Sequence, residues 1–160
     1  MSQVVGQITT ELFLISPTNP LPTKPIFKRI ENIIYNIDIH PTLNRVYIHT
    51  NAGDITNHFV FEMHLSYFSK LKGRYDIETA FYKYGTKVYA KEDEFIEKMQ
   101  LFEKWLVLWV RKNGLRVFKV LSIPDNKVVY EYKAPGSVYS LYPSNIGDMV
   151  PLLSLLISDF

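Results

Sequence analysis

Alternating apolar and polar residues mark a first hairpin near the middle of the chain. Residues 45–50 and 55–61 alternate in this way, and they flank a turn-forming tetrapeptide at 51–54. Such alternation is typical of strands with one buried face, and asparagine, glycine and aspartate favour tight turns. With the turn centred on the middle of the tetrapeptide, we expect Val46 to pair with Phe59.

This register assigns each side chain of the hairpin to one of two faces. The first face is dry and carries Val46, Ile48, Ile55, Phe59 and Phe61. The second face is wetter and carries Arg45, Tyr47, His49, Thr56, His58 and Val60. The sequence therefore predicts that His49 and His58 lie diagonally beside each other on the wetter face.

A second hairpin is predicted further along the chain. Residues 105–111 and 115–121 surround Asn113-Gly114, a dipeptide that strongly favours a two-residue hairpin turn. Residue 110 then opposes 117, and apolar side chains fall on both faces, as in strands at the centre of a sheet. A turn at 123–126 leads into 127–133, so three consecutive antiparallel strands are expected.

One segment carries a helical pattern. Apolar side chains recur at three- and four-residue spacing at Phe95, Ile96, Met99 and Phe102, and acidic residues crowd the start of the segment. We therefore expect one clear helix at about 92–103. Shorter patterns predict strands at 3–15 and 33–39, a short helix at 65–71 and two short strands within 79–90. The expected fold class is α+β, mainly β, with antiparallel hairpins in a meander.

Composition is that of an ordinary globular chain, with 47% hydrophobic and 21% charged residues in 160 positions. We expect a single domain over residues 1–160. Four prolines within nine positions make 16–25 an extended loop. The apolar C-terminal segment 146–160 is expected to pack back as a strand or helix, or else to form a subunit interface.

Cysteine is absent, which removes disulfides, thiolate nucleophiles and cysteine-based zinc sites from consideration. The apolar run at 149–157 is far shorter than the roughly 20 residues that cross a bilayer. Residues 1–16 also lack the basic start of a signal peptide. We expect an intracellular protein without membrane contact, and the sequence does not distinguish cytoplasm from nucleus.

Three segments resemble blades of a WD-repeat-like β-propeller. Residues 37–55 contain a strand ending at His40-Pro41, a second strand and a Gly-Asp turn, residues 106–118 resemble the middle of a blade, and 137–144 the start of a third. The chain lacks a Trp-Asp dipeptide, and a closed ring of at least four blades leaves no place for the expected helix. The resemblance implies a binding platform without catalysis, and it assigns no functional residues.

Two constellations are candidates for metal chemistry. His49 and His58 are within reach of a shared ion, but no third ligand has an assured position. Asp125 and Glu131, with Lys133, are similar to a signature of metal-dependent nucleases. If 126–133 is one strand, however, about 20 Å separates the two carboxylates, which is too far for one ion. Phosphate-binding loops and hydrolase motifs are absent, so we predict no catalytic residues and no cofactor.

Cations interleaved with aromatic residues suit single-stranded nucleic acid, because bases stack on rings while phosphates pair with lysine and arginine. A net charge of +2 is too small to indicate nucleic acid by itself. The candidate residues for such an interface are Lys70, Lys72, Arg74, Trp109, Arg111, Lys112, Arg116 and Phe118.

The leading hypothesis is a non-catalytic protein-binding or scaffold subunit of a larger assembly. A lack of reactive constellations beside abundant apolar and aromatic residues supports it, and a protein partner or a second copy of the chain is expected. The alternatives are a single-stranded nucleic-acid-binding β-sheet or barrel module and a metal-dependent nuclease.

Overall fold

A computed structural model describes residues 25–27, 30–40, 42–54, 56–71, 77–133, 139–143 and 155–159. The strand expected at 3–15 and most of the proline-rich loop at 16–25 lie outside the described residues. So do Lys72 and Arg74 and most of the segment 146–160.

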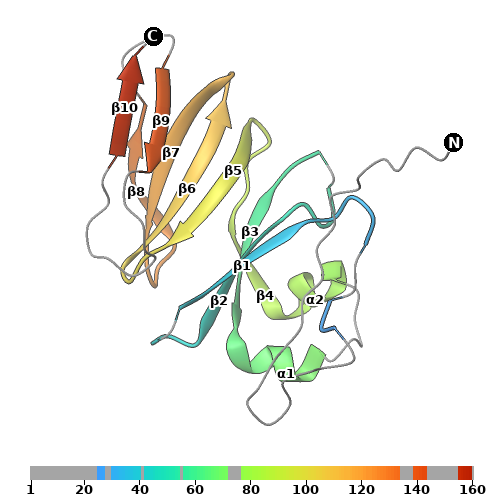
Figure 1. The fold of residues 1–160 in the computed structure, drawn as a ribbon. Helices are drawn as coiled ribbons and strands as arrows, with labels where there is room; N and C mark the ends of the chain where they lie inside the picture. The colour runs from blue at the N-terminus through green and yellow to red at the C-terminus, as the bar shows by residue number, and fades with distance from the viewer. Residues whose placement is uncertain are drawn as a thin grey trace, which may run out of the picture.

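The first sheet is antiparallel and has four strands in the order β1-β2-β3-β4 (Figure 1). Its strands are β1 (Tyr35–His40), β2 (Arg45–Thr50), β3 (Phe59–His64) and β4 (Gly85–Tyr89). The strand expected at 33–39 and the hairpin that follows it are therefore confirmed.

The predicted register of this hairpin is wrong, because Val46 pairs with Met63 and Phe59 with Thr50. The loop between β2 and β3 is therefore longer than a tight turn. The side chain of Asn51, in this loop, forms hydrogen bonds with the segment that precedes β1. Asn51 accepts a hydrogen bond from the Ile34 N–H at 2.9 Å and donates one to the Asn32 carbonyl at 2.8 Å. The register differs by four residues, an even number, so the predicted division into two faces still holds for the described residues.

Helical segments connect β3 to β4. The 3₁₀ helix η1 (Leu65–Tyr67) and α1 (Phe68–Leu71) confirm the short helix expected at 65–71. Helix α2 (Ile77–Tyr84) replaces the first of two short strands expected within 79–90. Its Ala80 and Phe81 are buried against the first sheet, so tertiary packing outweighs the strand preference of its aromatic residues.

The second sheet is also four-stranded and antiparallel, in the order β5-β6-β7-β8. It contains β5 (Glu94–Leu101), β6 (Trp105–Lys112), β7 (Leu115–Ser122) and β8 (Lys127–Tyr132). Val110 opposes Val117, which confirms the predicted register at the Asn113-Gly114 turn. The meander and the central position of β6 and β7 are confirmed as well.

The helix expected at 92–103 is wrong, because these residues form β5 and the turns on either side of it. A β-bulge between Ile96 and Lys98 explains the misleading pattern. Glu94 and Ile96 are buried two positions apart, but the next buried residue is Met99, three positions on. The bulge thus inserts a helix-like interval into a strand.

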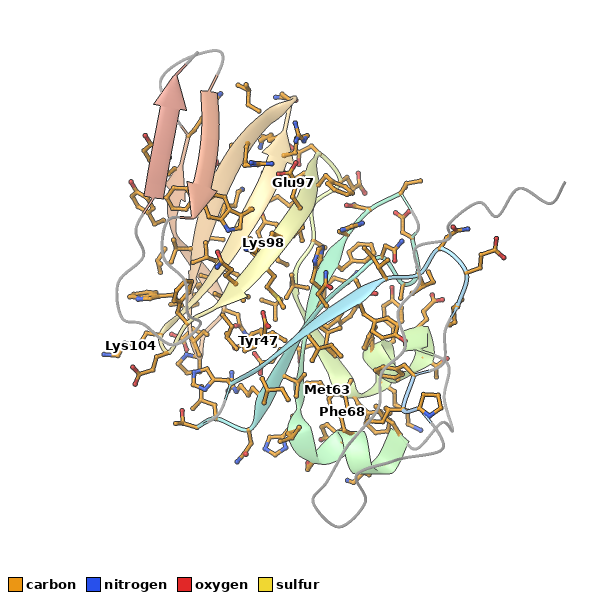
Figure 2. The ribbon with its side chains drawn as sticks, in the orientation of Figure 1. Tyr47, Met63, Phe68, Glu97, Lys98 and Lys104 are labelled. Atoms are coloured by element: carbon orange, nitrogen blue, oxygen red, sulfur yellow. The ribbon has the colours of Figure 1, made fainter. Side chains whose placement is uncertain are left out.

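The two sheets pack face to face around a shared core (Figure 1). Tyr47, Val60 and Tyr89 of the first sheet meet Ile96 and Leu108 of the second. The opposite face of the first sheet packs on α1 and α2, and Figure 2 shows Met63 and Phe68 on that side while Tyr47 lies toward the second sheet. A third cluster, with Trp109 and Phe118, covers the other face of the second sheet.

A separate two-stranded sheet pairs β9 (Tyr139–Pro143) with β10 (Leu155–Asp159). Strand β10 belongs to the apolar C-terminal segment, so this part of the segment packs back as a strand. The mainly β, α+β fold class is confirmed. No helix among the described residues has the length and apolar character needed to cross a membrane.

Candidate functional site

Polar side chains cross the boundary between the two sheets at several points. The Tyr47 hydroxyl of β2 donates to Asn126 Oδ1 at 3.2 Å, and Arg45 donates to the Pro124 carbonyl at 3.0 Å. His40 Nε2 lies 2.8 Å from the Glu103 carbonyl oxygen. Burial and the charge of Glu62 raise the pKa of Tyr47 to about 12, so its hydroxyl stays protonated. These contacts join the sheets through the loops next to β5 and β8.

His49 and His58 form a buried pair on the same boundary. His49 Nε2 lies 2.8 Å from His58 Nδ1, and the two residues are only 1% and 8% exposed. The predicted diagonal placement is therefore correct, while the burial of both rings was not expected. Among the described residues there is no group of three or more histidine, cysteine or carboxylate side chains placed to hold a metal ion.

Both histidines are held neutral by their surroundings. Burial, followed by the charge of His58, lowers the pKa of His49 to about 4, and burial lowers the pKa of His58. The backbone of Ile96 has a smaller, opposing effect on both rings. Neither ring is therefore charged at neutral pH.

A buried carboxylate lies near the start of β5. Glu94 Oε1 accepts hydrogen bonds from Lys119 at 2.8 Å and Lys112 at 3.0 Å, while its second oxygen accepts one from the Tyr89 hydroxyl. Lys119 also pairs with Glu131 at 3.0 Å. Sequence reasoning missed this cluster, because it assigned Glu94 to the first turn of a helix.

The cluster fixes the charge of each member. Burial alone would raise the pKa of Glu94, but hydrogen bonds from Lys119, Tyr89 and Lys112 outweigh it and lower that pKa to about 2. Burial and the bond to Glu94 raise the pKa of Tyr89. Burial opposes the charge of Lys119, yet its bonds to Glu94 and Tyr89 raise its pKa. A general acid or base works best with a pKa near the working pH, and all three lie far from neutrality.

The candidate nucleic-acid residues on β6 and β7 are engaged inside the protein. Glu97 accepts hydrogen bonds from Arg111 Nε at 2.8 Å and from Arg116 Nε at 2.6 Å. Trp109 and Phe118 are buried with their ring centroids 5.7 Å apart. A phosphate at this surface must compete with Glu97, and a base cannot stack on either ring.

The other candidate cations lie apart from this group. Lys112 pairs with Asp93 at 3.1 Å as well as with Glu94. Lys70 lies on α1, exposed, with its ammonium 5.1 Å from the Tyr67 ring. The six candidates that the structure describes therefore do not form one surface, while Lys72 and Arg74 lie outside the described residues.

The nuclease-like residues are not brought together. Asp125 is exposed in the turn before β8, and Glu131 lies near the other end of that extended strand. Six residues of strand span about 20 Å at 3.3 Å per residue. Glu131 is directed to Lys119 on the neighbouring strand, with which it pairs across the sheet.

Strand β8 exposes apolar side chains. Val128, Val129 and Tyr130 are each about half exposed, at 46%, 53% and 53%. Within the described part of the chain, β8 pairs with β7 alone and is therefore an edge strand of the second sheet. Three consecutive exposed apolar residues on such a strand are typical of an interaction surface.

Comparison with solved structures finds a similar fold within oligopeptidase B. The Trypanosoma brucei protein, in a closed form with covalently bound antipain, matches 84% of this chain with 20% sequence identity and a TM-score of 0.64. Oligopeptidase B from Leishmania major matches 74% of this chain with 16% identity and a TM-score of 0.56. The matches cover 18% and 16% of those proteins, so this chain spans less than a fifth of either.

No family model matches the sequence, and no curated protein matches it either. Oligopeptidase B is a protease whose non-catalytic region is a β-propeller. At 20% identity or less, the likeness concerns the fold alone. The β-rich, antiparallel architecture of this chain thus has counterparts in parts of two oligopeptidase B structures.

Proposed function

We propose that this chain is a non-catalytic, propeller-like binding or scaffold module that acts within a larger assembly. The observation that carries the proposal is the face-to-face stack of two four-stranded antiparallel sheets. Consecutive blades of a β-propeller are arranged in this way. The fold likeness to oligopeptidase B supports the proposal, because the non-catalytic region of that protease is a propeller.

The three blade-like segments of the sequence fit this arrangement. Residues 37–55 include β2 in the first sheet, 106–118 join the two central strands of the second, and 137–144 contain β9 of the third. The helix expected at 92–103 was the main feature that did not fit a propeller-like fold. Its replacement by β5 completes the second four-stranded sheet.

The state of the titratable groups supports a role without catalysis. Glu94, Tyr89 and Lys119 hold one another in fixed charge states, and His49 is neutral. None of these four groups is poised to exchange a proton near neutral pH. Binding through the exposed residues of β8 requires no such exchange.

Light scattering coupled to size-exclusion chromatography tests the proposal, because self-association is the form of assembly that the purified chain can reveal. We expect the mass to rise above that of a monomer with concentration, and Val129→Lys to reduce the rise by charging the exposed strand. The control is Ile39→Lys, which charges an apolar residue that is 52% exposed on β1. A monomer at every concentration, or equal effects of both substitutions, would count against β8 as a binding surface.

A further inference from the structure

The His49–His58 pair lies where the two sheets meet. His49 is on β2, opposite Asn36 of β1 and Val60 of β3, and it shares the inner face of the sheet with Tyr47. The ring of Phe95, from β5 in the second sheet, lies 4.2 Å from the His58 ring, centroid to centroid. The pair is thus a part of the contact between the sheets.

Few groups would stabilise an extra proton on the pair, because the Ile96 backbone is the one favourable influence on both rings and is outweighed by burial. The bond between His49 Nε2 and His58 Nδ1 needs one N–H and one lone pair, which two neutral rings supply. His49 Nδ1 is buried and has no partner of good hydrogen-bond geometry among the described residues. A further proton therefore places a positive charge in a dry contact, where an unpaired charge is strongly disfavoured.

Carboxylates on the surrounding strands are already engaged. Besides the pair itself, the charged or titratable groups on these strands are Tyr35, Asp38 and His40 of β1, Arg45 and Tyr47 of β2, Glu62 and His64 of β3, Lys87 and Tyr89 of β4, and Glu94, Glu97 and Lys98 of β5. Glu62 pairs with Arg45, Glu94 with Lys119, and Glu97 with Arg111. Asp38 also has an interaction of its own. The electrostatic effect on His49 comes from His58, so a new charge there is not neutralised.

We propose that the His49–His58 pair makes the contact between the two sheets sensitive to acid, so that uptake of a proton by the pair separates β5 from the first sheet. The neutral pair closes the contact, and the protonated pair opens it. Phe95 and Ile96 move away from the rings, and water reaches the new charge. The change reverses when the proton leaves.

The direction of the pH effect follows from proton binding. In the closed state the pKa of His49 is about 4, against 6.5 for a solvated histidine. The closed state therefore binds fewer protons than the open state between these values, and it loses stability as the pH falls through this window. The closed state has its full stability well above pH 6.5. The equilibrium constant for opening rises about a hundredfold between pH 7 and pH 4.

Two measurements test the proposal on the whole chain. The absence of cysteine allows spin labels at Glu78→Cys on α2 and Lys127→Cys on β8, two exposed positions on the two sides of the contact. We expect the label-to-label distance distribution to widen and lengthen reversibly below about pH 5. Histidine resonances recorded over the same range should show the ring of His49 titrating with the same midpoint.

The matched variants separate the pair from other acid effects. In the H49Q/H58Q double variant the distance distribution should stay unchanged with pH, whereas H64Q, which replaces an exposed histidine, should respond as the wild type does. An unchanged distance in the wild type, an equal response in the double variant, or a normal titration of His49 would overturn the proposal. If the double variant does not fold, the wild type alone tests the proposal. The midpoint of the distance change and the midpoint of the His49 titration must then agree, and a mismatch between them overturns the proposal.

Discussion

Lys119 is a lysine with 1% exposure, and the cost of burying its charge is offset by two carboxylates and a tyrosine. The sequence predicts only that Lys119 lies on the strand at 115–121, beside Phe118. The difference arises because Glu94 lies on a neighbouring part of the sheet but 25 residues away in the chain. Local patterns contain no information about such a partner.

Replacing Lys119 with methionine should lower the free energy of unfolding by about 3 kcal/mol, because Glu94 keeps its buried charge and loses its closest cation. Lys112→Met is the control, since Lys112 binds the same oxygen but is partly exposed and solvent screens its charge, so its loss should cost clearly less. Urea denaturation at neutral pH measures both. Equal losses would contradict a special role for the buried cation.

Glu97 is expected to suppress binding of single-stranded nucleic acid. Its carboxylate holds Arg111 and Arg116, so Glu97→Gln should raise the affinity for an oligonucleotide by about threefold to tenfold at low salt. Fluorescence anisotropy with Glu78→Gln, which removes an exposed acid on α2, gives the matched comparison. Equal affinities of Glu97→Gln and the wild type would show that Arg111 and Arg116 do not contact the oligonucleotide.

The adjacency of His49 and His58 was predictable, but their burial was not. The adjacency follows from how a hairpin places its side chains on two faces. An error of four residues in register leaves every side chain on its face, so the two rings still meet. Their burial depends on Phe95 and Ile96 of a second sheet, at a place where the sequence predicted a helix.

Individual elements could be predicted where turn chemistry is local. Asn113 and Gly114 both adopt positive φ, at 50° and 80°, as a two-residue hairpin turn requires, and the register of β6 and β7 followed directly. Strand β5 could not be predicted, because its bulge imitates helical spacing. Helix α2 was missed as well, since its apolar face is defined by packing against β3 in the core of the first sheet rather than by a long repeat.

Gly85 joins α2 directly to β4, and this junction should tolerate no side chain. A Cβ at this position would lie 2.7 Å from the Phe81 carbonyl oxygen, a backbone atom that cannot move without disturbing the helix. Gly85→Ala should therefore cost about 2 kcal/mol or more. Gly114→Ala, in open space at φ +80°, should cost about 1 kcal/mol from its backbone conformation. Thermal denaturation monitored by circular dichroism compares the two, and equal losses would contradict the steric argument.

At the scale of the molecule, the two sheets share the core between them and should unfold together. Trp105 and Trp109, the two tryptophans, both lie on β6, so tryptophan fluorescence follows the second sheet while circular dichroism follows both. We expect coincident urea transitions at neutral pH. Tyr47→Phe, which removes a hydrogen bond between the sheets, should lower the free energy of unfolding by about 1 kcal/mol by both probes. Separate midpoints would show that the sheets unfold independently.

Helices α1 and α2 have a consequence for the geometry of the whole stack. They cover the face of the first sheet that points away from the second sheet, together with Phe27. In a closed ring of blades, each blade packs against a neighbour with both of its faces. If this chain is the propeller-like module that we propose, its first sheet, with helices on one face, is therefore suited to be the terminal unit of an open array. A further sheet could then pack against the second sheet.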